Sequence, residues 1–552
     1  WPMKIAVAQI NYHIGNFEKN RDLINNAVDS AKKQGADLVV FSELCVPGYP
    51  PLDLLDRIDF IERCKETVND IAKHCEGITA IIGSPTVNPN SEGKKLFNSA
   101  LVVSEGRILF TANKALLPTY DIFDEYRYFE PARRFAVYDF MGYRLAITVC
   151  EDLWDEQHFD NEFEKRRLYT VSPMEELAKE KPDLIINISA SPFSHSKTNI
   201  KKGIFRGKAE KYGIPVINVN QTGANTELIF DGASLIVNGR GEVWKSLPFF
   251  EESLLTFSAA DLIAGREPEG DSDRDPVELI HKALITGIRD YFSKSGLKKC
   301  ILGLSGGIDS ALCLTLAAEA LGPENARVVL MPSRYSSAHS VSDAIELSEK
   351  LGVEYDIINI EKPFSAFAEI LGPVFKGRET DVTEENIQAR IRAVILMALS
   401  NKLGYILLNT SNKSEAAVGY GTLYGDMAGG LSVLGDVYKT EIYKLARYIN
   451  RESEIIPNNT ILKAPSAELR PDQLDTDSLP DYRILDAILY QYIELQKPPH
   501  RITGDNIDQE TVRKVIKMIN TNEYKRYQAP PVLRISSKSF GDGRRMPLVA
   551  RY

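Results

Sequence analysis

The sequence lacks any long run of apolar residues. Its longest apolar stretches, such as Leu184–Ile188 and Cys300–Leu304, fall far short of the roughly 20 residues that a membrane-spanning helix needs. No charged segment followed by an apolar one opens the chain, so nothing indicates a secretory signal. We therefore expect no transmembrane segment and no membrane partner.

Cysteine is also scarce. The 6 cysteines form no Cys-x-x-Cys pair and follow no regular spacing. A disulfide framework or a structural zinc site shows such patterns, so both are disfavoured. We expect the chain to work in a reducing compartment, and the cytoplasm is the expected location.

The chain has no excess of positive charge. Its 66 basic and 76 acidic residues give a net charge of -10, which disfavours nonspecific binding to nucleic acid. A content of 43% hydrophobic and 26% charged residues is ordinary for a globular protein and argues against disorder. At about 100–200 residues per domain, the length of 552 residues indicates more than one domain.

What the sequence does contain is two series of strands alternating with helices. The first occupies residues 3–262 and the second residues 276–552, and no internal repeat relates them. Residues 263–275 include the stretch AGREPEGDSDRD, which is rich in charge, glycine and proline, and we interpret this segment as a linker. Long helices between the strands of the second series imply a parallel doubly wound sheet, with ligands at the carboxyl ends of its strands.

Apolar patterning predicts most elements of both series. In the first, strands are expected at residues 3–10, 36–41, 79–83, 101–103, 145–149, 184–188 and 216–219, a helix at 21–33, and a hairpin over 234–244 that turns at Asn238-Gly239. In the second, strands are expected at 300–304, 327–331, 355–360 and 405–409, and helices at 276–292 and 384–403. The basic tail, residues 523–552, is interrupted by proline and glycine. Taken alone, its composition predicts a flexible C-terminal segment.

A small-residue loop, Ser305–Ser310 (SGGIDS), joins an expected strand to an expected helix. Its glycines let the backbone approach a phosphate, and free N–H groups with the helix dipole supply positive potential. The loop is not a Walker loop, because the GxxxxGK[ST] pattern is absent. An ordinary glycine-rich turn has a similar sequence, so the loop alone leaves both interpretations open.

In this position SGGIDS resembles the loop of the pyrophosphatase-loop family of ATP enzymes, which split ATP between its α- and β-phosphates and adenylate a substrate oxygen. Asp309 would repel a polyphosphate unless a cation lay between them, so we interpret it as a Mg²⁺ ligand. The alternative is an acid that only stabilises the helix N-terminus. Further motifs narrow the resemblance to the NAD synthetase family, in the family's order: NIQAR from Asn386, LNTSNKSE from Leu408, GYGTLYGD from Gly419, Lys439 and PSAEL from Pro465.

This resemblance covers nearly all of residues 276–552 and implies roles for individual positions. The residues implied to contact ATP are Gly303, Leu304, Ser305, Gly306, Gly307, Ile308, Asp309, Ser310, Thr410, Lys439 and Ser466. Those implied to bind deamido-NAD are Asn386, Arg390, Glu415 and Lys538, with Asp309 and Glu415 as the metal ligands. Taken alone, Asn386 and Arg390 would be a solvated helix face and Lys538 a surface lysine. Some family members carry a lysine where Leu423 stands, so no contact is assigned there.

Three reactive side chains of the first series, Glu43, Lys114 and Cys150, each stand where an expected strand ends. We expect them to converge above one sheet. A thiol attacks only as the thiolate, so it needs a base or a cation nearby. Glu43 would take the proton, and Lys114 would stabilise the thiolate and then the oxyanion. Each residue alone is a weak signal, because a lone buried cysteine is more often a packing group.

Together the three resemble the Glu-Lys-Cys triad of the nitrilase superfamily. The stretches CEDLW at 150–154 and KALLPTY at 114–120 resemble its glutaminase branch, which occurs fused to NAD synthetase. The resemblance covers about residues 3–260 and implies hydrolysis of glutamine through a thioester. It places glutamine at Tyr120, Ser191 and Lys197, where other members carry arginine at position 197, and a second acid beside the triad at Glu125. Otherwise Tyr120 is a core or rim residue, Ser191 a turn residue and Glu125 a surface acid.

The two resemblances imply an α/β chain: an N-terminal nitrilase-like αββα sandwich, and a C-terminal doubly wound parallel sheet that is Rossmann-like and of the adenine nucleotide alpha hydrolase type. They also imply an ATP-dependent, glutamine-hydrolysing amide ligase that makes NAD from deamido-NAD through an adenylated intermediate. Mg²⁺, a protected route for ammonia and a homo-oligomer are part of the same expectation. Two alternatives stay open: a related amidotransferase that adenylates another carboxylate, and a non-catalytic dinucleotide-binding protein.

Overall fold

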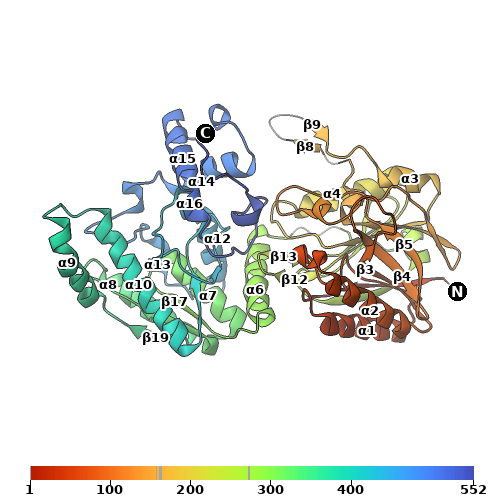
Figure 1. The fold of residues 1–552 in the computed structure, drawn as a ribbon, viewed down its shortest axis with the longest axis horizontal. Helices are drawn as coiled ribbons and strands as arrows, with labels where there is room; N and C mark the ends of the chain where they lie inside the picture. Colours follow the sequence, from red (N-terminus) through yellow and green to blue (C-terminus); the bar gives the residue numbers. More distant parts are fainter. Residues whose placement is uncertain (1, 157, 161–164, 271–273) are drawn as a thin grey trace. The chain divides into compact units, whose positions relative to one another are not determined.

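The computed structural model describes residues 2–156, 158–160, 165–270 and 274–552. The chain forms two compact units, the first ending at Arg274 and the second beginning at Asp275 (Figure 1). This boundary falls inside the expected linker, of which residues 271–273 lie outside the described residues. Among the described residues, every helix is too short or too polar to cross a lipid bilayer.

The described part of the first unit contains two six-stranded sheets. The first has the order β16-β1-β2-β3-β4-β5, with bounds Ser253–Ser258, Lys4–Gln9, Leu38–Val40, Thr79–Val87, Leu96–Ser104 and Arg107–Asn113. The second has the order β15-β14-β11-β10-β7-β6, with bounds Val243–Ser246, Leu235–Val237, Val216–Asn220, Leu184–Ser189, Tyr143–Val149 and Tyr138–Phe140. Strands β1, β2 and β3 pair in parallel, as do β7, β10 and β11, so their carboxyl ends lie together at one edge of each sheet.

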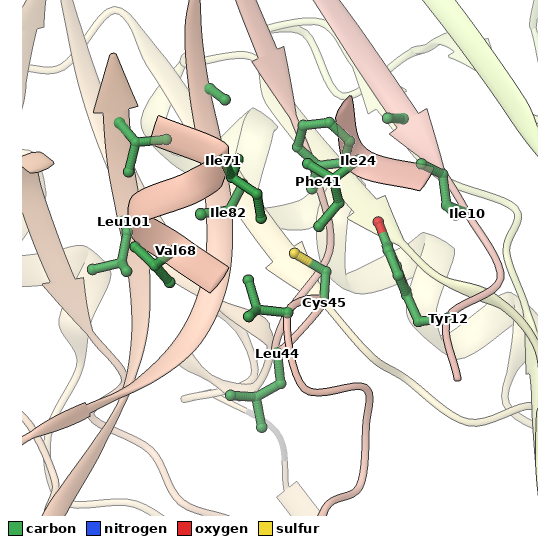
Figure 2. Packing of buried hydrophobic residues seen from close by; sticks show 14 of the residues in the cluster. Ile10, Tyr12, Ile24, Phe41, Leu44, Cys45, Val68, Ile71, Ile82 and Leu101 are labelled. Atoms are coloured by element: carbon green, nitrogen blue, oxygen red, sulfur yellow. The ribbon is translucent and has the colours of Figure 1, made fainter. Parts of the chain in front are cut away.

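The two sheets pack against each other through one apolar layer. Ile5 and Val40 of the first sheet belong to the same buried cluster as Ile147 and Ile186 of the second. Helices α1 (Phe17–Lys33) and α2 (Ile58–His74) cover the outer face of the first sheet, where Ile24, Val68 and Ile71 pack with Phe41 and Ile82 (Figure 2). Helices α3 (Pro173–Lys179) and α4 (Thr198–Tyr212) cover the outer face of the second. The result is the αββα sandwich that was expected.

The second unit is built on a parallel five-stranded sheet with the order β19-β18-β17-β20-β21. The bounds are Glu354–Ile357, Ala326–Leu330, Cys300–Gly303, Ile406–Asn409 and Leu431–Ser432. Helix α7 (Ile308–Leu321) follows β17, and the long helix α10 (Val382–Leu403) packs through Ile391 and Leu396 onto the sheet. The strand order reverses between β17 and β20, and ligands of doubly wound sheets bind at such a reversal.

The strands and helices expected from apolar patterning are present, with ends shifted by a few residues. The hairpin β14–β15 is present as well, but its loop runs from Asn238 to Glu242 instead of turning at Asn238-Gly239 alone. The Asn238 side-chain oxygen accepts the backbone N–H groups of Arg240 and Glu242, at 3.0 and 3.1 Å, and so holds the wider loop.

The tail, residues 523–552, is held against the second unit and is not the flexible segment that its composition predicts. Val532 bridges to Ser432 at the edge of the sheet, and the Asp436 carboxylate accepts the backbone N–H groups of Ile535 and Ser536, both at 2.7 Å. Leu533 and Ile535 are buried. The partners of the tail are about a hundred residues away in sequence, which is why its composition gave no sign of this order.

Candidate active sites

The triad residues of the first unit come from both sheets. Glu43 follows β2 and Lys114 follows β5, both of the first sheet, whereas Cys150 follows β7 of the second. The expectation that they converge above one sheet is therefore wrong. Because the two sheets pack face to face, the ends of their strands can supply one site from both sides.

Lys114 lies between two carboxylates. Its Nζ is 2.7 Å from Oε1 of Glu43 and 2.8 Å from Oε2 of Glu125, and the ammonium is fully buried. The Asn98 side-chain amide donates to Oε1 of Glu43 at 2.7 Å, and the backbone N–H of Ala190 donates to Oε2 at 3.0 Å. The Tyr49 hydroxyl donates to Glu125 at 2.8 Å. Both carboxylates are thus oriented by donors from other strands and loops.

The electrostatics favour a neutral thiol in the resting site. Burial raises the pKa of Cys150 well above its ordinary value, Glu43 raises it further, and Lys114 opposes this rise. Burial by itself lowers the pKa of Lys114, but Glu125 and Glu43 raise it well above its ordinary value, so the side chain stays an ammonium. Cys150 therefore needs a base to become a nucleophile, and Glu43 is the neighbouring carboxylate with the largest influence on it.

The backbone at Cys150 is in the left-handed region, with φ of 42°. A side chain in this region costs roughly 1–2 kcal/mol relative to the right-handed one. Such a turn between a strand and a short helix, Cys150–Leu153, places the thiol at the tip of the strand. Strained backbone of this kind is often found where a nucleophile is held in position.

Two of the residues expected to bind glutamine, Tyr120 and Lys197, act on the carboxyl of Glu151, which follows Cys150 in the chain. The hydroxyls of Tyr120 and Tyr169 each donate to Oε1 of Glu151 at 2.8 Å, and Glu151 is buried beside Cys150. Burial raises the pKa of Glu151, while Tyr120 and Lys197 are among the groups that lower it. The backbone N–H of Ser191 donates to Asn220 at 2.9 Å, one residue after the Ala190 N–H that binds Glu43.

In the second unit a cavity of about 300 Å³ opens at the carboxyl ends of β17, β18 and β20, where the strand order reverses. All the residues expected to contact ATP line it except Gly306. A Cβ at Gly306 would lie 2.2 Å from the carbonyl oxygen of Ser340, and its φ is +81°. Gly306 therefore packs against the start of helix α8 (Ala338–Leu351), which lets the rest of the loop curve around the cavity.

The expected metal ligands, Asp309 and Glu415, both line this cavity. The Asn412 side-chain amide donates to Asp309 at 2.9 Å, and Lys439 forms an ion pair with the other oxygen of that carboxylate. Burial raises the pKa of Glu415, Asp309 raises it further, and Lys439 opposes the rise. Two neighbouring carboxylates that repel each other are a suitable place for a cation.

The pair fits Mg²⁺ in particular. Among the described residues there is no cluster of three or more acidic, histidine or cysteine side chains that would hold a metal by itself. Mg²⁺ is usually held by one or two carboxylates and shares the remaining positions with water and substrate phosphates. Asp309 and Glu415 beside the phosphate loop have this composition.

Of the residues expected to bind deamido-NAD, only Glu415 lines the cavity. Asn386 accepts a hydrogen bond from the Thr422 hydroxyl at 2.7 Å, and Nε of Arg390 donates to the Leu423 carbonyl at 3.1 Å. Both therefore hold the loop that follows helix α11 (Lys413–Val418). The carbonyl of Lys538 accepts from the buried ammonium of Lys413 at 2.8 Å, so the tail is fixed next to the same helix.

Sequence reasoning assigned no role to several residues of these sites. Glu151 and Asn412 lie inside the motifs CEDLW and LNTSNKSE, so those motifs could have identified them as site residues. Asn98, Tyr49 and Arg392, the last of which lines the cavity, stand in no motif that pointed to them.

Comparison with known proteins identifies both units. A family model described as Carbon-nitrogen hydrolase matches residues 4–262, and one described as NAD synthase matches residues 280–529. The glutamine-dependent NAD(+) synthetase of Synechocystis sp. is 41% identical over 99% of this chain and 99% of its own. That of Thermotoga maritima is 40% identical over 100% of this chain and 99% of its own.

The chain belongs to the family of glutamine-dependent NAD(+) synthetases. A solved glutamine-dependent NAD(+) synthetase from Acinetobacter baumannii, in complex with ADP, is 36% identical, with a TM-score of 0.78 over 100% of this chain and 99% of its own. That of Cytophaga hutchinsonii gives a TM-score of 0.83 over 100% of this chain and 98% of its own, at 22% identity, and this likeness shows the fold alone. The expected fold class is thereby confirmed, with the two units arranged along the chain as in other glutamine-dependent NAD(+) synthetases.

Proposed function

We propose that the two units divide the synthesis of NAD between them. The chain is an ATP-dependent amide ligase that converts deamido-NAD, ATP, glutamine and water to NAD, AMP, pyrophosphate and glutamate. The observation that carries this function is the match to glutamine-dependent NAD(+) synthetases at about 40% identity over the whole chain. The arrangement of Glu43, Lys114 and Cys150 in the first unit, and of the phosphate loop in the second, is consistent with each half-reaction.

In the first unit, Glu43 takes the proton of the Cys150 thiol as the sulfur attacks the amide carbon of glutamine. Lys114 offsets the negative charge on the oxygen of the tetrahedral intermediate. Collapse of that intermediate breaks the C–N bond, and the proton held by Glu43 leaves with ammonia. Glu43 then deprotonates a water that attacks the thioester. This step releases glutamate and restores the free thiol of Cys150. Tyr120, Ser191 and Lys197 hold the glutamine, and Glu125 holds Lys114 in place.

In the second unit, the nicotinate carboxylate of deamido-NAD attacks the α-phosphate of ATP and releases pyrophosphate. The residues Gly303–Ser310, with Thr410, Lys439 and Ser466, bind the nucleotide. Asp309 and Glu415 would hold Mg²⁺, which supplies positive charge to the phosphates. Asn386, Arg390, Glu415 and Lys538 bind deamido-NAD. Ammonia then attacks the adenylated carboxyl carbon, AMP leaves, and the amide of NAD is formed.

The ammonia must arrive without a proton, because ammonium has no lone pair with which to attack. We therefore include in the proposal a protected route between the sites and a homo-oligomer that builds it. A cytoplasmic location agrees with the need for a reduced Cys150.

The function is tested by mass spectrometry of the products formed from deamido-NAD, ATP, Mg²⁺ and glutamine labelled with heavy nitrogen in its amide. We expect NAD that carries the label, together with AMP, pyrophosphate and glutamate in equal amounts. An adenylated product other than NAD would favour a related amidotransferase. Binding of deamido-NAD without any turnover would favour a non-catalytic dinucleotide-binding protein.

A further inference from the structure

A half-buried cation in the wall of the nucleotide cavity, Arg392, has no role in the reaction described so far. Arg392 lies on α10, and the cavity lining includes its neighbours on the same face of the helix, Ala389, Ala393 and Leu396. Nε of Arg392 donates to the carbonyl oxygen of Met331 at 3.1 Å. Met331 follows the carboxyl end of β18, so this bond fixes the guanidinium at the edge of the sheet where ligands of this fold bind.

Among the residues that the structure describes, the terminal nitrogens of this guanidinium have no protein partner. Within the described part of the chain, Arg392 makes this one hydrogen bond and no ion pair. Burial lowers the pKa of Arg392 to about 10, with Asp426 and Glu468 acting against the decrease, so the side chain is still charged at neutral pH. A charged group that is partly removed from water without a partner is costly unless something else neutralises it.

The two nearby carboxylates are engaged elsewhere. Asp426 accepts the backbone N–H of Thr422 at 2.6 Å. Glu468 accepts the hydroxyls of Ser337 and Ser340, at 3.0 and 2.7 Å, at the start of α8. Both carboxylates line the cavity, so Arg392 faces a space in which neither is directed at its terminal nitrogens.

We propose that Arg392 is a substrate-binding residue whose two terminal nitrogens bind a pair of anionic oxygens of the substrate in this cavity. This inference rests on the proposed function, because both substrates of the second unit bring such oxygens there: ATP its phosphates, and deamido-NAD the carboxylate that is adenylated. The guanidinium is planar and suits a bidentate acceptor, which either group provides. The bond from Nε to Met331 leaves the two terminal nitrogens as the donors directed at the ligand.

The test compares Arg392→Met, Arg392→Lys and the wild type in the full chain. The control is Arg483→Met, because Arg483 is 88% exposed in its side chain and its ion-pair partner is Asp481 in its own turn. Binding of ATP alone, and of deamido-NAD alone, is measured by isothermal titration, with KM for each substrate measured beside it. Loss of a charged bidentate contact should weaken binding about 10- to 100-fold in Arg392→Met. Arg392→Lys should recover only part of this loss, because an ammonium lacks the planar fork.

The two arms identify the ligand. Weaker binding of ATP alone, and a smaller rise in melting temperature on adding ATP, would show that Arg392 binds a phosphate of ATP. Unchanged ATP binding with a raised Kd and KM for deamido-NAD would identify deamido-NAD as the ligand of Arg392. Melting without ligand separates binding from structure. We expect Arg392→Met to melt close to the wild type, since it removes a half-buried cation whose terminal nitrogens have no partner among the described residues.

The inference is overturned if Arg392→Met binds both substrates and turns over like Arg483→Met. It is also overturned if Arg392→Met, Arg392→Lys and Arg392→Gln, which keeps a donor for Met331, all fail to fold, since the role would then be structural. A wild type that neither binds ATP nor forms NAD would refute the proposed function instead.

Discussion

Nζ of Lys114 lies 2.7 Å from Oε1 of Glu43, and neither side chain is exposed to solvent. One ammonium therefore neutralises Glu43, the proposed general base, while it also bonds to Glu125 and lowers the pKa of Cys150. Removing one partner of a buried ion pair leaves the other charge without compensation, which is strongly destabilising. Lys114 thus links the chemistry of the first site to its folding.

Lys114→Met should reduce glutaminase activity on the order of 10²–10³-fold, the usual cost of losing one donor to an oxyanion. The pKa of Cys150 should rise, because Lys114 is the group that opposes its increase. Alkylation by iodoacetamide, followed against pH, should therefore begin at a higher pH than in the wild type. The control is Lys179→Met, since Lys179 is exposed and, among the described residues, pairs only with Glu176 one turn away. Unchanged alkylation and unchanged activity would show that Lys114 acts elsewhere.

Cys150→Ala should abolish NAD synthesis from glutamine and leave synthesis from high concentrations of ammonium chloride largely intact. The surviving activity should increase with pH, because a larger fraction of the ammonium is then deprotonated to the reactive ammonia. Both nitrogen sources are assayed on one preparation after a thermal melt confirms folding. Synthesis from glutamine at the wild-type rate would refute the nucleophile, and loss of both activities in a folded protein would refute the division of labour.

Asp309→Asn should abolish NAD formation from either nitrogen source, and pyrophosphate release should fall in parallel. The substitution removes a charge that faces Lys439 and, in the proposed function, the Mg²⁺ that accompanies ATP. Glutaminase activity in the absence of ATP should remain. The matched control is Asp481→Asn, an exposed acid near the start of α14 (Tyr482–Leu489). If Asp309→Asn supports wild-type synthesis from ammonia, the assignment of this carboxylate is wrong.

Lys413→Met should release the tail. The buried ammonium of Lys413 is 2.9 Å from Asp436 and 3.0 Å from Glu494, and it donates to Ser536 and the Lys538 carbonyl, both at 2.8 Å. Its loss leaves two buried carboxylates, so we expect the second unit to lose about 3–5 kcal/mol of stability. The melting transition and the rate of proteolysis within residues 532–540 are the measurements.

Ser536→Ala is the milder change at the same place, because it removes one hydroxyl and leaves the ion pairs. It should raise KM for deamido-NAD more than it lowers kcat, if the tail carries Lys538 to the substrate. Lys514→Met, at an exposed position of α15 (Gln509–Thr521), is the control. Equal proteolysis of the tail in Lys413→Met and in this control would contradict the role of Lys413.

Much of the fold follows from local patterns in the sequence. Continuous apolar runs marked the buried parallel strands, such as 184–188, and the long helix α10 was expected at residues 384–403. The sites were recognised by resemblance of whole motifs, and their individual residue roles remain predictions.

The features that were missed depend on pairings between distant parts of the chain. Strand β16 pairs antiparallel with β1 across almost the whole first unit, and the triad takes its cysteine from the second sheet. Asn98 and Tyr49 are isolated polar residues in sequence. Only the folded chain brings each of them to the carboxylate that it orients, Glu43 and Glu125 respectively. Arg392 was missed because a lone arginine on a helix is ordinarily a solvated side chain.

The left-handed backbone at Cys150 means that folding and chemistry favour different residues at this position. Glycine adopts a φ of 42° without the cost that a Cβ brings, so Cys150→Gly should melt above Cys150→Ala. A library selected for heat resistance alone, with ammonia supplied, should therefore accumulate glycine at position 150. Its members would still make NAD from ammonia but would be unable to use glutamine. The ability to draw nitrogen from glutamine is thus maintained only while selection for it continues.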